Sequence, residues 1–335
     1  MGDKVLLSHG SGGKQTNKLI NELFLKYFNN EVLNELNDAA HLILYNSNIV
    51  FTTDSFVVNP VFFNGGDIGK LSICGTVNDI AVSGAKPLFL SSAFIIEEGF
   101  PLEKLETIVK SMADEAKKAG VKIVTGDTKV VNKGSADGIF INTTGIGIKY
   151  NGVNISSNNA KPGDVVIVNG SLGDHGIAIM CERNNLGIEG NLKSDCASLN
   201  TLVDSILKVS PNTHVIRDAT RGGIAAVLNE IAEMSKITIA IEEKAVPVKE
   251  EVSGVCQILG LDPLYIANEG KICVFVPEEY AESVLNEMKK HPLGVDSSII
   301  GGVTEYRNSR VYIDTIIGGK RIVDMPSGDQ LPRIC

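Results

Sequence analysis

Hydrophobic and polar positions follow each other in short blocks, and the spacing within each block predicts helices and strands. The clearest helix begins after Pro101, where apolar residues recur every three or four positions as far as Ala116 and Gly120 follows. Helical spacing also covers 68–80 and ends before Pro87. The other elements predicted in this half are a helix over 19–28 and strands over 42–58, 88–96, 121–124 and 139–148.

A stretch of Asn, Ser, Gly and Pro at 150–163 interrupts this pattern, and it predicts a domain boundary. Alternation then resumes, with blocks at 165–169, 174 onward, 217–234, 237–241, 250–259 and 272–276. Periodicity is lost after Ile322. We therefore expect two halves of mixed α and β structure and a tail, divided as an N-terminal segment 1–40, a first domain 41–155, a second domain 156–323 and a mobile tail 324–335.

Composition narrows the class of protein. The 335 residues are 43% hydrophobic and 21% charged, which is typical of a globular chain of about two domains. A net charge of −9, 5% aromatic residues and no Trp argue against nucleic-acid binding. No apolar run approaches the length of a membrane span, and the six cysteines form no CxxC pair. These features favour a reduced, cytoplasmic protein with no membrane partner.

Three acidic residues share a similar sequence context in the first half. Asp54 and Asp127 each follow an apolar strand, and Asp79 lies in a helix bounded by glycines. Buried carboxylates that lie together need a cation or hydrogen bonds, and Mg²⁺ takes a few carboxylates together with phosphate oxygens. The alternative is that each is a cap or turn residue. As a set, they favour a site for Mg²⁺ and a nucleotide.

Glycine clusters precede two of the predicted helices. His9-Gly-Ser-Gly-Gly-Lys14 and Thr220-Arg-Gly-Gly223 both offer backbone N–H groups and a cation to an anion. Neither is a P-loop: Gln15 follows Gly13-Lys14, and the other Gly-Lys pair, Gly69-Lys70, is followed by Leu71 and lacks the earlier Gly. Gly12, Gly13 and Arg221 are therefore candidates for binding phosphate, and plain turns are the alternative.

The last residue is Cys335, at the end of about ten residues without periodicity, which can reach ~30 Å from their anchor. We expect its thiol to be exposed, with Arg333 favouring the thiolate and the terminal carboxylate opposing it. The functional interpretation is a carrier thiol that collects a group elsewhere and presents it to the active site of its own chain. The alternative is a frayed end with an accidental cysteine.

Several motifs carry a specific resemblance that runs from Leu7 to Cys335. They are HGSGGK (9–14), TTDSF (52–56), GTVNDIAVSGAKP (75–87), TGDTKVV (125–131), RDATRGGIA (217–225), IANEGK (266–271) and LPRIC (331–335). The chain resembles the HypE family of hydrogenase maturation factors, the carbamoyl dehydratases, in the superfamily of aminoimidazole ribonucleotide synthetase, selenophosphate synthetase and thiamine monophosphate kinase. The terminal LPRIC singles out this family within the superfamily.

The resemblance implies a two-domain fold like that of aminoimidazole ribonucleotide synthetase. The first domain is α/β and forms a barrel-like interface in a homodimer, the second is α+β, and a flexible tail follows. ATP and Mg²⁺ are the implied cofactors. The implied partners are a carbamoyltransferase of the HypF type and a HypC–HypD scaffold.

The implied reaction is the ATP-dependent dehydration of a carbamoyl group on Cys335 to a thiocyanate, which supplies cyanide to the iron of a NiFe hydrogenase. The resemblance places Lys129 and Glu269 near the thiol, and we expect them to form an ion pair. It assigns contacts with the nucleotide, besides the three aspartates and the two glycines, to Asn78, Asp218 and Arg221. Two alternatives remain: a small-molecule kinase or synthetase of the same superfamily, and a non-catalytic scaffold that docks partners through its tail.

Overall fold

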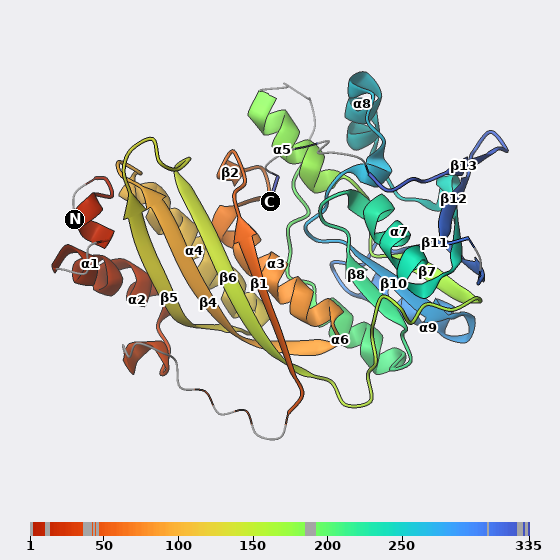
Figure 1. Ribbon diagram of the computed structural model, residues 1–335, viewed down its shortest axis with the longest axis horizontal. Coiled ribbons are helices and arrows are strands. Elements are labelled where there is room, and N and C mark those ends of the chain that lie inside the picture. The colour runs from red at the N-terminus through yellow and green to blue at the C-terminus, as the bar shows by residue number, and fades with distance from the viewer. Residues whose placement is uncertain are drawn as a thin grey trace.

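The computed structural model describes residues 3–10, 14–35, 42, 44, 47–184, 192–306, 308–326, 331, 334 and 335. Two halves, each built around a sheet, lie side by side along the longest axis of the molecule (Figure 1). The first sheet ends at Lys149 and the second begins at Asp164, so the chain passes between them through the segment predicted as a boundary. No helix of the described residues is long and apolar enough to cross a membrane.

The first half contains a four-stranded sheet in the order β1-β6-β4-β5. Its strands are β1 (Ile49–Phe56), β4 (Ala85–Glu97), β5 (Lys122–Val131) and β6 (Ile139–Lys149). Only the β4·β5 pair is parallel. The sequence predicts a strand of only four residues at 121–124, whereas β5 continues to Val131 because β4 pairs with it along that whole length.

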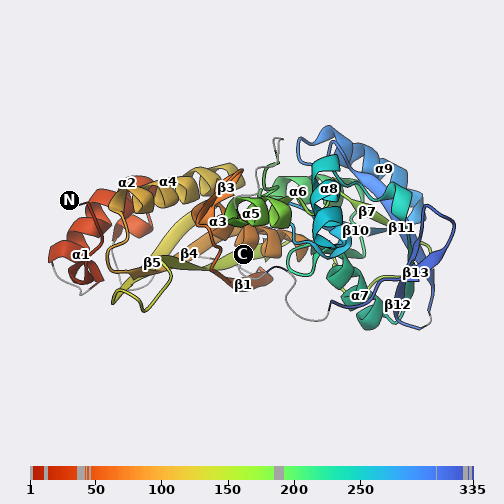
Figure 2. The same ribbon diagram turned by 90° about the horizontal axis from the view of Figure 1, so that it is seen from above.

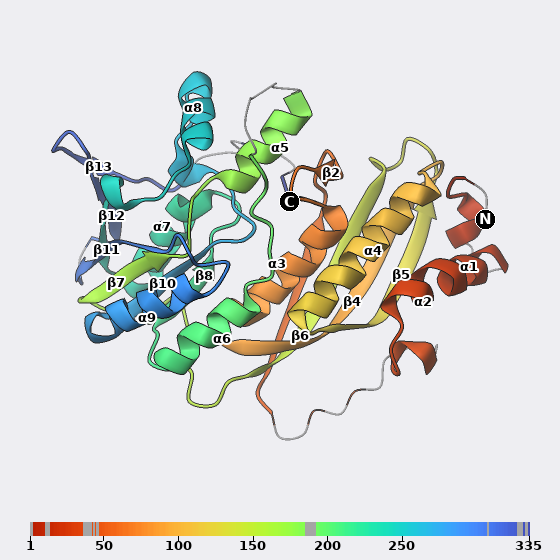
Figure 3. The same cartoon turned by 180° about the vertical axis from the view of Figure 1, so that it is seen from behind.

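Two helices, α3 (Ile68–Val82) and α4 (Leu102–Ala119), cover one face of this sheet (Figure 3). The helix predicted after Pro101 is confirmed: Pro101 is the N-cap of α4 and Gly120 is its left-handed C-cap. Most of α3 is buried, because the sheet covers one side and the second half of the molecule covers the other. Gly147 of β6 allows this close packing, since a Cβ there would lie 2.3 Å from Cγ2 of Ile80.

Short elements complete the first half. They are the hairpin of β2 (Phe62–Phe63) and β3 (Gly66–Asp67), and the N-terminal turns and helices η1 (Leu7–Gly10), α1 (Lys14–Leu19), η2 (Ile20–Phe24), α2 (Leu25–Phe28) and η3 (Leu33–Glu35). The N-terminal helices lie beside α4 at the end of the molecule far from the second half (Figure 2). They bury Leu19, Leu23 and Phe24 in the core of the first half.

The second half contains a seven-stranded sheet in the order β13-β12-β9-β11-β7-β10-β8. Its strands are β7 (Asp164–Val168), β8 (Val215–Asp218), β9 (Thr238–Glu242), β10 (Ile272–Pro277), β11 (Ser298–Glu305), β12 (Arg310–Asp314) and β13 (Lys320–Ile322). The strands β7 and β10 are buried on both faces.

Helices pack on both faces of this sheet. One face packs against α7 (Gly223–Ser235), and the other packs against α6 (Asn200–Val209) and α9 (Glu278–Lys290). The helices α5 (Asp174–Asn184) and α8 (Glu250–Leu259) form a smaller cluster at one end, with turns η4 (Glu243–Ala245) and η5 (Pro263–Tyr265) nearby. The mixed α and β halves expected from the sequence are confirmed.

Candidate active site

The last two residues of the chain are docked in the interior rather than free in solvent. Ile334 is 5% exposed and packs in the core of the first half. Its carbonyl oxygen lies 2.6 Å from Nε2 of His175 in α5, and a main-chain oxygen of Cys335 accepts the N–H of Val57 at 3.1 Å. The expectation of an exposed terminal thiol is therefore wrong for this structure. Arg333 lies outside the described residues, and mobility of the tail in solution stays a prediction.

The surroundings of the thiol favour its neutral form. Burial raises the pKa of the Cys335 thiol to about 12, and the negative charge of Glu269 raises it further. Arg221 acts in the opposite direction with a smaller effect. The thiolate of Cys335 is therefore disfavoured while the tail is docked.

Glu269 lies in the loop before β10, in the same interior as Cys335. Its side chain is 3% exposed, and its Oε1 has no hydrogen-bond partner among the described residues. Burial raises the pKa of this carboxyl well above its usual range, and the charges of Asp195, Asp218 and Asp54 add to the rise. An unpartnered, buried carboxyl oxygen is costly, so a ligand that supplies a hydrogen bond here would be stabilised.

Three aspartates from both halves approach each other beside these groups. Burial raises the pKa of Asp54 in β1 to about 6, and the charge of Asp79 in α3 adds to this rise. Burial likewise raises the pKa of Asp218 in β8 to about 6, with further contributions from Asp79 and Asp54. The pKa of Asp79 is raised by burial as well, although Thr52 Oγ1 donates a hydrogen bond to its Oδ2 at 2.8 Å. The tertiary fold therefore joins Asp218 to two of the three carboxylates grouped from the sequence.

A cavity of about 510 Å³ opens between the two halves beside this cluster. Its lining includes Asp79 and Thr52 from the first half, Arg217 and Asp218 from the second, and the connecting residues Ser156 and Ser157. It combines a cation, carboxylates and hydroxyls in one cleft, a combination that suits a nucleotide with its metal ion.

The carboxylates fit a magnesium ion that is bound together with phosphate. Among the described residues, no three histidine, cysteine or carboxylate side chains form a ready-made metal site. Mg²⁺ does not require one, because it commonly takes one or two carboxylates plus phosphate oxygens and water. Asp54 and Asp79 repel each other and both have raised pKa values, so a divalent cation beside them would relieve the repulsion.

Asp127 is separated from this cluster by the sheet. Cross-strand partners place Asp54, Thr143, Ser92 and Gly126 in one row, on the face that α3 covers. Asp127 is the next residue of β5 and so faces the other way, and its side chain is 62% exposed. The strands β6 and β4 also lie between β1 and β5, which puts the two edges about 14 Å apart. The predicted trio of Asp54, Asp79 and Asp127 is not formed within one chain.

Lys129 lies on the same outer face as Asp127. Its Nζ is 3.1 Å from Asp127 Oδ2, and its side chain is 65% exposed. Glu269 is buried on the other side of the sheet, so the expected ion pair between Lys129 and Glu269 is not formed within one chain. Alternation of side chains along β5 separates the two residues, and sequence position alone does not reveal on which face a residue lies.

The remaining predicted residues have different positions. Arg221, just before α7, is near enough to Asp54 and Cys335 to affect the pKa of both.

The side-chain amide of Asn78 is hydrogen-bonded to the backbone of the second half. Its Nδ2 donates to Ala197 O at 3.1 Å, and its Oδ1 accepts from Leu199 N at 2.7 Å. Asn78 thus joins the two halves rather than facing an open site. The predicted glycines at positions 12 and 13 lie outside the described residues.

The structure adds residues that the sequence analysis did not identify. His175 holds the C-terminal end, Arg217 and Thr52 surround Asp79, and Asp195 binds the loop that carries Glu269. The only sequence signal for His175 is its place in Gly173-Asp-His-Gly176, directly after a predicted turn. Nothing in the local sequence distinguishes Asp195 from a surface aspartate.

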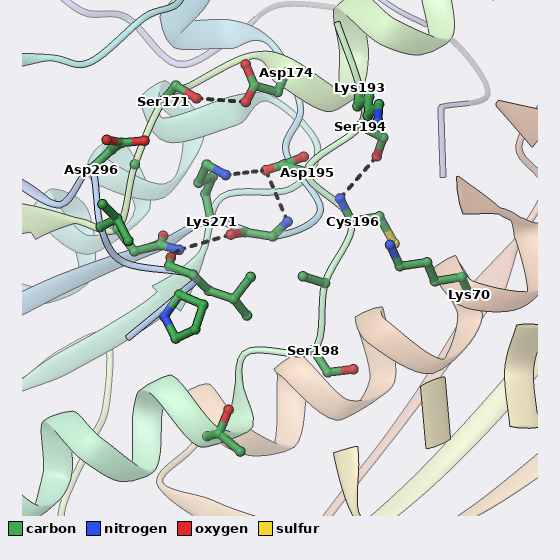
Figure 4. Close-up of a pocket in the computed structure, with 18 of the residues that line it drawn as sticks. Lys70, Ser171, Asp174, Lys193, Ser194, Asp195, Cys196, Ser198, Lys271 and Asp296 are labelled. Atoms are coloured by element: carbon green, nitrogen blue, oxygen red, sulfur yellow. Dashed lines mark hydrogen bonds and ion pairs between the residues drawn. The ribbon is translucent and has the colours of Figure 1, made fainter. Parts of the chain in front are cut away.

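A second cavity, of about 590 Å³, is lined in part by the segment 193–198 (Figure 4). Five lysines contribute to its lining, at positions 70, 118, 193, 249 and 271. Lys271 faces Asp195 across the edge of this cavity, with 3.2 Å between Nζ and Oδ2 (Figure 4). The loop of Glu269 therefore reaches this cavity through Gly270 and Lys271, beside Asp195.

Comparisons with known proteins are consistent with this geometry. Residues 36–149 match the family model for the N-terminal domain of AIR synthase related proteins, and residues 161–314 match that for the C-terminal domain. The chain is 48% identical over 331 residues to the carbamoyl dehydratase HypE of Azotobacter vinelandii, covering 99% of this chain and 97% of the relative.

Two solved structures are similar throughout. A crystal structure of the hydrogenase maturation protein HypE in complex with ATP superposes with a TM-score of 0.95 at 47% identity, covering 98% of this chain and 99% of the other. A crystal structure of a HypE–HypF complex contains a chain that is 54% identical, with a TM-score of 0.81, covering 92% of this chain and 99% of the other.

Proposed function

Because the chain belongs to the HypE family of carbamoyl dehydratases, we propose that it dehydrates a carbamoyl group carried on its own Cys335, using ATP. The observation that carries this proposal is the position of Cys335. The thiol at the end of the chain lies in the interior beside Glu269, close to the aspartate cluster and the interdomain cavity. A small-molecule kinase would have no use for a terminal thiol placed there.

Dehydration of the carbamoyl group requires that its oxygen, a poor leaving group, be converted into a good one. The carbamoylated thiol is an S-thiocarboxamide, and its oxygen attacks the γ-phosphorus of ATP, so that ADP leaves. The amide nitrogen loses one proton, the carbon–oxygen bond then breaks with loss of phosphate, and the nitrogen loses its second proton. The carbon–sulfur bond is retained throughout. The products are a thiocyanate on Cys335, ADP, phosphate and a proton.

Glu269 is the group that we assign to proton removal. A general base must lie within hydrogen-bond reach of the proton it takes, and Oε1 of Glu269 has no protein partner among the described residues. The raised pKa of its carboxyl makes Glu269 a stronger base once it is ionised. The thiol of Cys335 is half-buried and close enough to Glu269 for that carboxyl to affect its pKa, so a carbamoyl group on the thiol would lie near Glu269.

The nucleotide is assigned to the cavity between the halves. Arg217 at the cavity and Arg221 beside Asp54 supply positive charge for the phosphates, and Thr52 orients Asp79. Mg²⁺, held by Asp54 and Asp79, would neutralise the charge on the transferred phosphoryl group. The HypE structure in complex with ATP, which shares this fold, supports the binding of ATP.

We also propose a homodimer formed through the outer face of the first sheet. This face exposes large apolar side chains, with Phe51 67% exposed, Ile49 52% and Ile95 45%. Exposed apolar patches on a sheet favour contact with a partner. Asp127 and Lys129 lie on this same face. We therefore assign their contacts to the second copy of the chain in the homodimer.

Further partners follow from the family. We propose that a carbamoyltransferase of the HypF type loads Cys335, as the HypE–HypF complex of a relative supports. We propose a HypC–HypD scaffold as the acceptor that receives the cyanide for a NiFe hydrogenase. A cytoplasmic location agrees with six cysteines that are all free in the structure.

Mass spectrometry of the C-terminal peptide tests the proposed reaction. After incubation with the carbamoyl donor protein, we expect the peptide to gain one carbamoyl group and then to lose one water only when ATP is added. Cys335→Ser should remain unmodified, whereas Cys181→Ala, which removes a partly buried thiol elsewhere, should behave like the wild type. Absence of any modification on Cys335 would refute the proposal.

A further inference from the structure

The loop that carries Glu269 is held by the side chain of one buried residue. Asp195 Oδ1 accepts the N–H of Glu269 at 3.1 Å, and Oδ2 accepts the N–H of Gly270 at 3.2 Å. Oδ2 also lies 3.2 Å from Nζ of Lys271 (Figure 4). Three consecutive residues of the loop are thus bound to one carboxylate whose side chain is only 3% exposed.

The backbone of the loop also lies against the backbone around Asp195. A Cβ on Gly270 would lie 1.9 Å from the carbonyl oxygen of Asp195, so only glycine permits this approach. Ala197 N–H donates to Glu269 O at 3.4 Å. Because both peptide N–H groups bind one rigid carboxylate, Glu269 has little freedom to shift along the loop.

Ser194, the residue before Asp195, is connected by hydrogen bonds to the backbone beside the thiol of Cys335. Ser194 Oγ is 2.8 Å from Nδ1 of His175, and Nε2 of His175 is 2.6 Å from the carbonyl oxygen of Ile334. The carbonyl can only accept, so Nε2 carries the proton and Nδ1 accepts from the Ser194 hydroxyl. Cys196 N–H donates in turn to Ser194 Oγ at 3.1 Å. The hydrogen bonds therefore form one directed chain from the segment 194–196 to the residue before Cys335.

We propose that Ser194 and Asp195 are positioning residues for the dehydration, Asp195 by fixing the backbone of Glu269 and Ser194 by orienting His175 onto the carbonyl of Ile334. Two adjacent residues then set the distance between the base and the carrier thiol. The inference rests on the proposed function, because it assumes that Glu269 acts on a group attached to Cys335.

A purely structural role predicts different consequences from a positioning role. A buried carboxylate that merely filled space could be replaced with a loss of stability alone. A residue that positions a base changes the chemical step while leaving nucleotide binding intact. Small displacements of reacting groups lower rates steeply, by roughly 100-fold for about 1 Å.

Single-turnover dehydration provides the test. Protein carbamoylated on Cys335 is mixed with ATP, and thiocyanate formation is followed by mass spectrometry of the C-terminal peptide. For Asp195→Asn we expect a rate roughly 10- to 100-fold below wild type, with the affinity for ATP unchanged. Asp164→Asn is the matched control, since the side chain of Asp164 is as buried as that of Asp195 but is bonded to His214 instead of the loop of Glu269. Its rate should remain that of wild type.

A double-mutant cycle separates this inference from the proposed function. In a Glu269→Gln background, Asp195→Asn should cause no additional loss of rate, because the group that Asp195 positions is already gone. An additive loss in that background, or equal losses for Asp195→Asn and Asp164→Asn, would overturn the positioning role. A wild-type rate for Glu269→Gln alone would instead refute the role of Glu269 in the proposed function.

Ser194→Ala is the second variant, and it tests the positioning role of the segment if Asp195→Asn fails to fold. We expect loading of Cys335 by the carbamoyl donor to be unchanged and the later dehydration to slow by roughly 10-fold or more. Dehydration at the wild-type rate in Ser194→Ala would show that the chain of hydrogen bonds to Ile334 does not position the thiol.

Discussion

Nε2 of His175 donates a hydrogen bond to the carbonyl oxygen of Ile334 at 2.6 Å, across a sequence separation of 159 residues. Both residues are buried, with His175 fully buried and Ile334 5% exposed. Burial lowers the pKa of His175, so the ring is neutral and its single proton is committed to this bond. The position of Cys335 against the core of the first half therefore depends on the ring of His175, which belongs to the second half.

Replacing His175 should release the terminal thiol. In His175→Ala the end of the chain loses its hydrogen bond, so we expect Cys335 to spend more time in solvent, where its pKa falls from about 12 toward the ordinary value. Alkylation of Cys335 by iodoacetamide at neutral pH should accelerate by roughly 10-fold or more, because the thiolate is the nucleophile. His214→Ala, which removes a histidine paired with Asp164 remote from the tail, should leave that rate unchanged. Equal rates in all three proteins would contradict this prediction.

The carboxylate cluster predicts an unusual dependence of stability on pH. The pKa of Asp218 is raised to about 6 in the folded state, against 3.8 for an unperturbed group, so the folded state binds this proton more tightly. Protonation of Asp218 should therefore increase the free energy of unfolding of the ligand-free protein as pH falls from about 7 to about 4. Asp218→Asn removes the charged form, and its melting temperature should exceed that of wild type by on the order of 2 °C near pH 8. The difference should shrink toward pH 4, and an excess that is the same at both pH values would count against the assignment.

Magnesium and ATP should stabilise the protein through the interdomain cavity. A ligand that binds only the folded state raises the free energy of unfolding by about 2.7 kcal/mol at 100 times its dissociation constant. We expect a clear rise in melting temperature with Mg²⁺ and ATP together, and loss of most of this rise in Asp79→Asn. Asp114→Asn, an exposed residue of α4 paired with Lys110, is the control that should keep the full rise. A full rise in Asp79→Asn would exclude Asp79 from the site.

The outer face of the first sheet should control association. Phe51→Asp places a charge in the exposed apolar patch, and we expect the proposed homodimer to dissociate to monomers in light scattering coupled to gel filtration. Ile317→Asp makes the same kind of change at a residue that is 95% exposed between β12 and β13. That control should remain dimeric. A dimeric Phe51→Asp variant would show that this face is not the interface.

The close approach at Gly270 should be essential for stability. A Cβ there meets the carbonyl oxygen of Asp195 at 1.9 Å, and backbone atoms cannot move away cheaply. We expect Gly270→Ala to lower the free energy of unfolding by about 2 kcal/mol or more in urea denaturation. Gly254→Ala in α8 meets nothing within 4 Å and should instead be neutral or stabilising by about 0.5–1 kcal/mol. Equal stabilities of the two variants would disprove the contact.

The sequence by itself determined the features that depend on neighbouring residues. The apolar stripe between Pro101 and Gly120 specifies α4, because helix periodicity and caps are local properties. The division into two halves of mixed α and β structure could equally be predicted from the sequence, and so could the unusual position of Cys335. The tertiary structure alone decided which side chains meet. Strand order and side-chain alternation put Asp127 and Lys129 on the outer face of the first sheet and brought Asp218 to Asp54 instead. Burial of Cys335 likewise depends on His175 and on apolar packing, and a local pattern cannot specify contacts between residues so far apart in the chain.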